Sequence, residues 1–127
     1  MNSATLEHVN ITVADPDKTA AMLCDLFGWK IRWRGNAKGN GLSVHVGTEE
    51  DYLAIYTPPT SLGPSANSNM MAGGLNHIGV QVDDLDAVEK RVVAAGLSPF
   101  NHANYEPGRR FYFLDGDGIE FEVMSYR

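Results

Sequence analysis

Two stretches of the chain alternate aliphatic and polar side chains, and each is followed by a stretch with helical spacing. Residues 8–13 and 77–82 put an aliphatic side chain at every second position. A period of two is typical of a strand that buries one face. In residues 16–27 and 85–93 the apolar side chains recur three or four positions apart, which predicts a helix after each strand.

Both predicted helices carry the residues expected at helix boundaries. Asp15 is suited to cap the first helix, the proline after it fits the first helical position, and Gly28 stops the helix. In the second helix Asp83 or Asp84 takes the cap position, and Gly96 ends the helix. The sequence therefore predicts the limits of the helices as well as their existence.

The two strand–helix stretches are copies of one unit. Segment 8–17 reads HVNITVADPD and segment 77–86 reads HIGVQVDDLD, so the histidine, the aliphatic positions and two aspartates recur at an offset of 69 residues. Such a duplication decides the architecture before local propensity is weighed. Three further strand-like segments follow each helix, at 30–34, 42–46 and 52–56 and at 98–100, 110–114 and 119–124.

The duplication predicts an α+β fold made of two βαβββ modules, at about residues 5–57 and 75–125. The stretch between them, residues 58–74, is rich in Pro, Ser, Gly and Asn and is predicted to be a linker. A chain of 127 residues with 43% hydrophobic and 20% charged residues suits one globular domain spanning residues 1–127.

Strand alternation also predicts that the candidate functional side chains lie on one face of each predicted sheet. A helix must cover the aliphatic face, which leaves His8 and His77 on the opposite face at equivalent places in the repeat. Glu122 in the last strand has the same parity, and the repeat puts Ala54 in the corresponding place of the first module. Two neutral imidazoles and one carboxylate bind a divalent ion and leave positions open for water or substrate. His8, His77 and Glu122 are therefore predicted metal ligands.

Other polar side chains of the same parity are candidates for the wall of the site. The candidates for a general base are His45, Tyr56 and Glu120. The candidates for substrate contact are Asn10, Arg110 and Tyr112. Arg110 can also pair with Glu120 across the strands, and the two tyrosines can be packing residues of the wall. His102 falls in a predicted loop at 101–108, where a histidine is most often solvated.

Composition narrows the class of protein and its partners. The net charge is −6, the isoelectric point is about 5.0 and the arginines are dispersed, which argues against nucleic acid because phosphate binding needs a basic stripe. No apolar run approaches the roughly 18 residues of a membrane span, and the first residues lack a signal-peptide pattern. The single cysteine, Cys24, excludes an intramolecular disulfide and suits a reducing compartment. We expect a cytoplasmic protein without membrane or nucleic-acid partners.

The chain resembles the vicinal oxygen chelate superfamily, which includes glyoxalase I, extradiol dioxygenases, methylmalonyl-CoA epimerase and the bleomycin and fosfomycin resistance proteins. The resemblance covers nearly the whole chain and rests on LEHVNITVADPDKTAAMLCDLFGWKIRW, GLNHIGVQVDDLDAVEKRVVAAG and FYFLDGDGIEFEV. It implies that the paired modules form a curved, cup-shaped mixed sheet with helices outside and a metal at its base. His8 and His77 match the family's first-strand histidines, and Glu122 matches its last-strand carboxylate. Ala54 departs from the pattern, because glyoxalase I-like members have a fourth ligand there, usually Glu or His.

For function, the resemblance implies a divalent-metal-dependent lyase, isomerase or dioxygenase acting on a small substrate that chelates the metal through vicinal oxygens. The ion is expected to be iron, manganese, zinc, nickel or cobalt. The alternative is a non-catalytic, resistance-type protein that binds a drug or a metabolite. A homodimer is expected, because the modules leave sheet edges and a half-open cup that a two-fold partner can cover.

Overall fold

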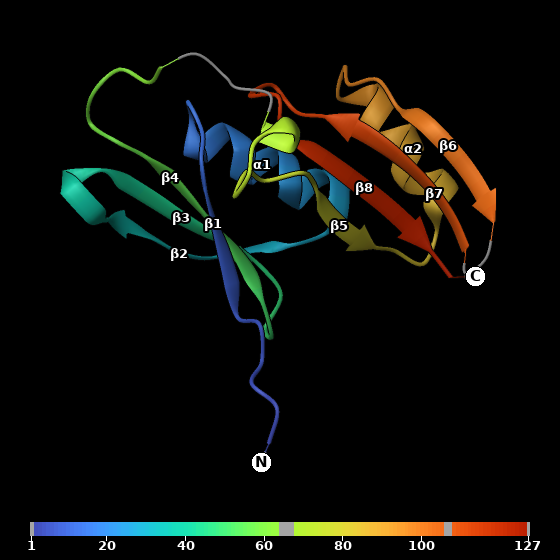
Figure 1. Cartoon of the computed structure of the whole chain (residues 1–127), viewed down its shortest axis with the longest axis horizontal. Helices are drawn as coiled ribbons and strands as arrows, with labels where there is room; N and C mark the ends of the chain where they lie inside the picture. The colour runs from blue at the N-terminus through green and yellow to red at the C-terminus, as the bar shows by residue number, and fades with distance from the viewer. Residues whose placement is uncertain (1, 64–67, 106–107, 127) are drawn as a thin grey trace. The chain divides into compact units, whose positions relative to one another are not determined.

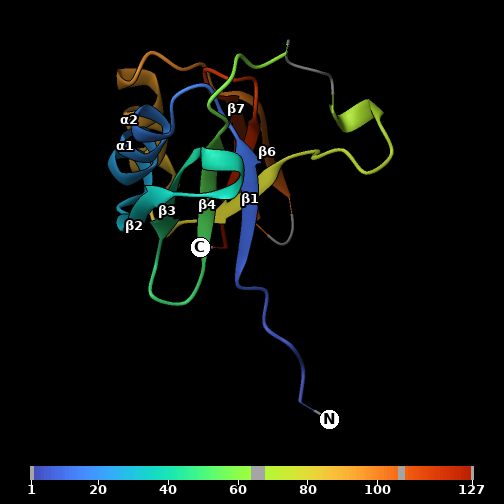
Figure 2. The ribbon, with the colours of Figure 1, turned by 90° about the vertical axis from the view of Figure 1, so that its left-hand side faces the viewer.

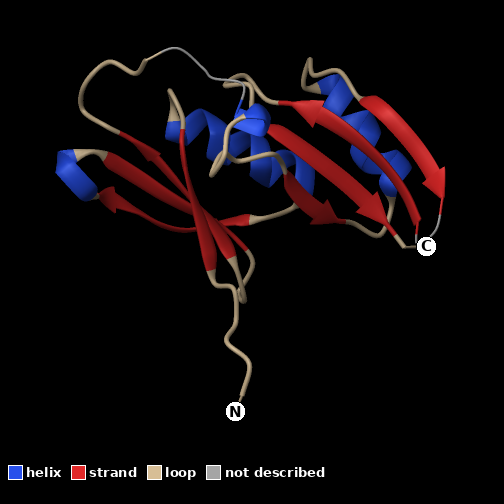
Figure 3. Ribbon diagram, in the orientation of Figure 1, coloured by secondary structure: helices blue, strands red, loops and turns tan. Residues whose placement is uncertain are grey.

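The computed structural model describes residues 2–63, 68–105 and 108–126. The chain divides into two compact units, Met1–Gly63 and Pro64–Arg127, and each unit holds one α-helix and one four-stranded sheet (Figures 1 and 3). Each unit is a βαβββ module, so the predicted α+β fold of two such modules is confirmed. Of the predicted linker, residues 64–67 lie outside the described part of the chain.

The first unit consists of β1 (His8–Thr12), α1 (Pro16–Phe27), β2 (Lys30–Asn36), the 3-10 turn η1 (Lys38–Asn40), β3 (Leu42–Gly47) and β4 (Tyr52–Thr57). Its strands are ordered β1-β4-β3-β2, with β1 parallel to β4 and the other pairs antiparallel. Figure 2 shows α1 on one side of this sheet. The opposite side of the sheet is free of helices within the unit.

The second unit consists of η2 (Ser68–Met70), β5 (Ile78–Gln81), α2 (Leu85–Ala94), β6 (Phe100–Tyr105), β7 (Gly108–Leu114) and β8 (Glu120–Ser125). Its strands follow the same order, β5-β8-β7-β6. The predicted strand at 98–100 and the predicted loop at 101–108 were wrong, because β6 runs through most of that stretch. The pairing of β6 with β7 shifts register between Phe100 and Ala103, and Asn101 has a φ of 52°. This irregularity breaks the period of two that a sequence pattern relies on.

The helix boundaries follow the predicted caps. The Asp15 carboxylate accepts from the Lys18 amide at 3.2 Å, and the Asp84 carboxylate accepts from the Ala87 amide at 3.0 Å. After α1 the chain turns at Gly28, whose φ of 69° is the left-handed conformation that favours glycine. Neither helix is long and apolar enough to cross a membrane, within the residues described.

Each sheet buries one face under its own helix and leaves the other face for polar side chains. Fully buried side chains include Leu23, Leu26, Val44, Val46 and Ile55 in the first unit and Val92, Phe111, Phe113, Phe121 and Val123 in the second. Among them, Ile55, Phe121 and Val123 are strand positions whose parity places them on the helix side. In the second unit Phe113 and Phe121 stack with their ring centroids 5.2 Å apart. We call the side of each sheet opposite its helix the open face.

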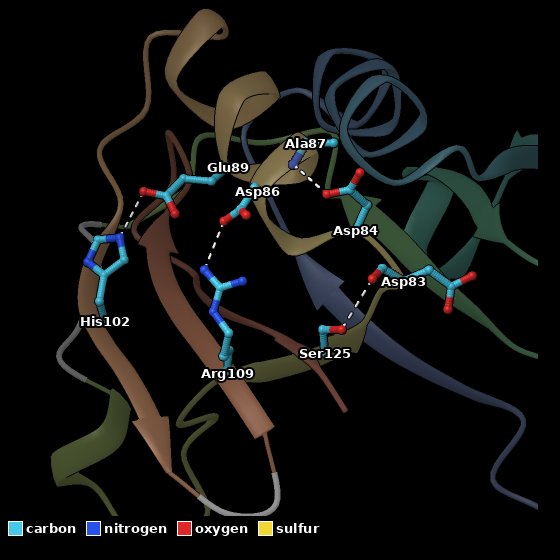
Figure 4. A network of polar contacts seen from close by, with 8 residues as sticks. All are labelled: Asp83, Asp84, Asp86, Ala87, Glu89, His102, Arg109 and Ser125. Carbon is cyan, nitrogen blue, oxygen red and sulfur yellow. Dashed lines mark hydrogen bonds and ion pairs between the residues drawn. The ribbon is translucent and has the colours of Figure 1, made fainter. Parts of the chain in front are cut away.

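A polar network fastens α2 to its own sheet (Figure 4). His102 of β6 contacts Glu89 of α2 at 2.8 Å, and Arg109 of β7 donates to Asp86 of α2 at the same distance. The Arg109 guanidinium holds the pKa of Asp86 below its usual value. His102 therefore has a hydrogen-bond partner on α2 and is not merely solvated.

The turn before β8 contains a buried carboxylate whose ionisation opposes folding. Asp115 is 7% exposed, and its Oδ1 accepts from the amides of Asp117 and Ile119, both at 2.9 Å. Its Oδ2 is buried without a partner among the described residues. Burial raises the pKa of Asp115 above its ordinary value of 3.8. The folded chain thus holds this proton more strongly than the unfolded chain does.

Replacing Asp115 by asparagine is expected to remove a pH dependence of stability. A raised pKa contributes stability that is complete below the unfolded value and disappears as the pH rises through the folded value. The free energy of unfolding of the natural chain should therefore fall relative to Asp115→Asn as the pH rises from about 4 towards neutrality. Urea unfolding across this range measures the difference. A constant difference between the two proteins would contradict the prediction.

Candidate metal centre

In the second unit, His77 and Glu122 meet on the open face. His77 directly precedes β5, and Glu122 lies on β8 opposite Gly79. The Nε2 atom of His77 is 3.1 Å from Oε1 of Glu122. The Glu122 side chain is 7% exposed and the His77 side chain is 34% exposed, so a buried carboxylate faces a reachable ring nitrogen.

The geometry of this pair suits two ligands of one ion. Ligand atoms that each lie about 2.1 Å from an ion at tetrahedral or octahedral angles are separated by roughly 3.0–3.4 Å. The other ring nitrogen of His77, Nδ1, is 2.8 Å from Oδ1 of Asn76. An amide oxygen only accepts, so Nδ1 donates to Asn76, and Nε2 is the nitrogen left either to donate to Glu122 or, when it carries no proton, to bind an ion. A second hydrogen bond of this kind orients metal-ligating histidines in general.

Arg110 is the third member of this cluster, and its partner differs from the predicted one. Its Nη1 donates to Oε2 of Glu122 at 2.9 Å, whereas the predicted cross-strand partner was Glu120. The error arose because Arg110 lies opposite Met124 in the β7–β8 ladder, so a diagonal contact reaches Glu122. Burial alone would lower the pKa of Arg110, but the hydrogen bond and charge of Glu122 raise it.

A hollow of about 340 Å³ lies beside this cluster within the second unit. Its lining includes His77, Tyr105, Arg110, Tyr112 and Glu120. Tyr112 lies opposite Glu122 in the ladder, and burial, followed by the Glu122 charge, raises the pKa of its phenol. The phenol therefore stays protonated near neutral pH and can donate a hydrogen bond. Three of the predicted wall residues, Arg110, Tyr112 and Glu120, thus gather around one hollow.

In the first unit, His8 is oriented in the same manner as His77. Its Nδ1 is 2.6 Å from Oε1 of Glu7, and its ring stacks on Tyr52 at 5.0 Å. The hydrogen bond from His8 lowers the pKa of Glu7, so this carboxylate only accepts and Nδ1 is the protonated nitrogen. Each repeat histidine therefore has an oxygen on Nδ1 that comes from the residue directly before it, Glu7 or Asn76.

A hollow of about 790 Å³ lies on the open face of the first unit. Its lining includes His8, Asn10, His45, Ala54 and Tyr56, which are the residues that alternation assigned to this face. Burial, and then the nearby His8 and Arg32, lower the pKa of His45, so its ring is neutral near neutral pH. A neutral imidazole can accept a proton or a hydrogen bond.

Strand register aligns the two open faces position by position. Asn10 lies opposite Ala54 and Gly79 lies opposite Glu122, so Ala54 occupies the counterpart of the Glu122 position, as the repeat predicted. His45 also lies opposite Ala54, as Tyr112 lies opposite Glu122. His45 therefore has a counterpart in Tyr112, which sequence reasoning missed because the two side chains differ in chemistry.

The structure brings together the part of the predicted ligand set that belongs to one unit. His77 and Glu122 are adjacent in the second unit, His8 belongs to the first, and the union of all three stays a prediction. Within residues 2–63, 68–105 and 108–126, no three His, Cys, Asp or Glu side chains form a cluster of the kind that holds a metal. Sequence reasoning did not identify Asn76 and Glu7 as the residues that orient the two histidines. The sequence feature that could have identified Glu7 and Asn76 is their equivalent position, directly before each repeat histidine.

Comparison with known proteins identifies the family. Residues 5–123 match the Glyoxalase/Bleomycin resistance protein/Dioxygenase superfamily, and the chain belongs to it. A search of the curated proteins finds no match.

Solved structures share the fold over nearly the whole chain. A glyoxylase/bleomycin resistance protein/dioxygenase domain from Frankia sp. EAN1pec is 22% identical, with a TM-score of 0.83 over 99% of this chain and 100% of that chain. The fosfomycin resistance protein FosX from Listeria monocytogenes is 22% identical, with a TM-score of 0.72 over 98% of this chain and 94% of that chain. A FosX mutant from the same organism, complexed with Mn(II) and 1S,2S-dihydroxypropylphosphonic acid, is 21% identical, with a TM-score of 0.72 over 97% and 93% of the two chains.

Proposed function

We propose that this chain is a divalent-metal-dependent enzyme acting on a small substrate that binds the metal through two adjacent oxygens. His8, His77 and Glu122 are the proposed ligands. The observation that supports the proposal most is the orientation of the His77–Glu122 pair, whose facing atoms are 3.1 Å apart while Asn76 holds the far ring nitrogen. Glu7 orients His8 in the same way. A purely structural histidine pair has no evident need for this repeated arrangement.

The proposed metal is one divalent ion per chain, drawn from iron, manganese, zinc, nickel and cobalt. The donor set of two imidazoles and a carboxylate suits all five, and the Mn(II) complex of FosX shows that a relative by fold binds such an ion. When bound, the ion polarises a substrate oxygen or acidifies a water, or activates dioxygen if it is ferrous iron. Lyase, isomerase and dioxygenase reactions all use this chemistry.

His45 is the favoured general base among His45, Tyr56 and Glu120. Its ring is neutral and lines the larger hollow, and it has no hydrogen-bond partner within the described residues. A neutral imidazole with a free nitrogen accepts a proton more readily than a phenol does at neutral pH. Asn10 and Tyr112 are proposed substrate contacts. Arg110 is proposed to contact the substrate through the part of its guanidinium that does not bind Glu122.

Elemental analysis of the purified protein tests the proposed metal site. The natural chain, reconstituted with each of the five metals in turn, should retain about one ion, and His8→Ala, His77→Ala and Glu122→Ala should each lose it. His102→Ala is the matched control, because His102 is bound to Glu89 and should leave the ion in place. If the natural chain retains none of the five metals, the proposal is wrong.

The residues that orient the ligands are expected to affect metal affinity in a graded way. Glu7→Gln and Asn76→Leu should each weaken binding by about 10–100-fold, because the partner of Nδ1 fixes the ring and its tautomer. Competition with a chromophoric chelator measures the affinity. Glu49→Gln makes the same change of charge at an exposed position and should have no effect. Equal effects of Glu7→Gln and Glu49→Gln would show that only net charge matters.

A non-catalytic protein that binds a drug or a metabolite is the second candidate. The observation in its favour is that Arg110 already neutralises Glu122, while Ala54 provides no fourth ligand. A guanidinium and an imidazole around one carboxylate form a satisfied cluster without any metal. This function predicts ligand binding that survives treatment with a chelator in a protein that never retains an ion.

The assembly and location follow from the same proposal. The strands β2 and β6 are at sheet edges, and a second copy of the chain is the proposed partner that covers such edges in a homodimer. Light scattering of the purified protein measures its mass. A cytoplasmic location is proposed because the single, unpaired cysteine Cys24 suits a reducing compartment.

A further inference from the structure

The hollow of the first unit has walls made of rings. Trp33 lies 4.9 Å from His45 between ring centroids, and His45 stacks on Tyr52 at 4.6 Å with 25° between the planes. Tyr56 lines the same hollow. Trp33 is 46% exposed, which is a large apolar surface left in contact with water. A ligand ring that packs against these walls would bury that surface.

Glycines fix two of these walls in place. A Cβ added to Gly35 would lie 2.6 Å from Cζ2 of Trp33, and one added to Gly41 would lie 2.5 Å from Cε1 of Tyr56. Each aromatic ring therefore lies close to the backbone of a glycine, where a larger side chain would collide with the ring. The walls are shaped by close packing and are not merely exposed side chains.

Within the described residues, the lining of this hollow contains no Asp, Glu, Lys or Arg. Its polar members are the amides Asn10 and Asn36, the hydroxyls Thr12, Ser43 and Tyr56, and the two imidazoles. Arg32, the cation nearest to the ring stack, lies over Tyr52 at 4.4 Å and donates to the Thr48 carbonyl at 3.1 Å. It is therefore engaged elsewhere and does not line the hollow. Among the described side chains of the lining, an anionic or cationic group would therefore meet imidazoles, amides and hydroxyls but no oppositely charged Asp, Glu, Lys or Arg.

The hollow of the second unit is different in both size and charge. It measures about 340 Å³ against about 790 Å³, and its lining includes Arg110 and Glu120. Pockets that hold whole small molecules typically span about 300–1,000 Å³, so the first hollow has room for a ring with substituents. The two open faces are thus specialised, the first for uncharged rings and the second for polar or charged groups.

We propose that the first-unit hollow holds a planar, uncharged ring of the ligand against Trp33, His45 and Tyr56, with Asn10 and Ser43 binding its polar substituents. Calling this ligand a substrate rests on the proposed function, but the ring contact itself needs no metal. The inference therefore selects aromatic or heteroaromatic compounds with neutral polar substituents as the class to test. It disfavours compounds whose only recognition group is a carboxylate.

Three probes of similar size separate planarity from charge. Benzamide is planar and neutral, benzoate is planar and anionic, and cyclohexanecarboxamide is neutral and puckered. Each is titrated into the full-length 15N-labelled protein in the presence of EDTA, and the indole signal of Trp33 and the amide signals of Ser43 and His45 are followed. Benzamide should bind at least about tenfold more tightly than the other two, because ring stacking and the absence of charge favour it alone. Trp29, which does not line the hollow, gives the reference indole signal.

Two variants place the binding in the hollow. Ala54→Leu fills the floor of the hollow, and Trp33→Leu removes one of its walls. Each variant should lower the affinity for benzamide by at least about tenfold. Ala21→Leu, the control for Ala54→Leu, makes the same alanine-to-leucine change at an exposed position of α1 and should leave benzamide binding unchanged. Trp33 is exposed, so its variant tests the inference even if Ala54→Leu does not fold.

The possible outcomes are distinct from those of the metal experiment. Equal binding of cyclohexanecarboxamide, tighter binding of benzoate, or no benzamide binding at all would overturn the inference, whether or not the protein retains a metal. If benzamide binds to a protein that retains no metal, the inferred ring site is supported and the proposed metal-dependent function is contradicted.

Discussion

Glu122→Gln is expected to lower the affinity for the metal by more than about 100-fold while the fold is retained. The amide keeps an oxygen that can accept from Arg110 at the place of Oε2, so the polar cluster survives. It removes the negative charge that holds a divalent ion, and the loss of a direct ligand should exceed the roughly 10–100-fold effect of losing an orienting partner. Chelator competition measures the affinity, and circular dichroism checks the fold.

Two further variants sharpen this test. Glu120→Gln makes the same change two residues away on the same face of β8 and should leave the metal affinity nearly unchanged. Glu122→Ala should lose the metal and also lower the urea midpoint, because the Arg110 guanidinium, 14% exposed, is left without its partner. If glutamine at position 122 binds the metal as tightly as glutamate does, Glu122 is not a ligand and its role is to pair with Arg110.

The parts of the fold that were predictable are those in which a local rule and the tertiary structure agree. Asp15 and Asp84 cap their helices because a side-chain oxygen before a helix satisfies amides that have no other partner. The repeat of His8 and His77 predicted two modules of the same element order, and the two sheets share one strand order because each copy buries the same face. β6 was missed because a register shift near Asn101 destroys the alternation that marks a strand.

The candidate site was predictable at the level of faces and not at the level of contacts. Parity alone placed Glu122 and His77 on one face, and they are adjacent there. It could not show that Arg110 reaches diagonally to Glu122, because side-chain length and rotamer decide such contacts. Nor could it show the ring-walled hollow, which depends on the close approach of Trp33 and Tyr56 to the backbone of Gly35 and Gly41. Periodicity specifies a face, whereas packing specifies a site.

Phe121→Ala is expected to lower the free energy of unfolding by about 4 kcal/mol, within the range for a large ring removed from a core. Phe121 is fully buried and stacks on Phe113 at 5.2 Å, so its loss leaves a cavity on the helix side of β7 and β8. Glu122 is the next residue on β8 and points to the open face. Loosening the strand should therefore lower the affinity for the metal by at least about tenfold, even under conditions in which the protein is still folded.

Leu53→Ala is the matched control for this coupling, since Leu53 in β4 occupies the counterpart of the Phe121 position in the first unit. It is 7% exposed and should cost about 3 kcal/mol, a loss comparable with that of Phe121→Ala. Its neighbour Ala54 provides no ligand, so metal affinity should fall less. Urea unfolding and chelator competition on both variants, at a temperature at which both are folded, separate stability from binding. Equal losses of affinity would mean that global stability, and not the packing beneath Glu122, controls the site.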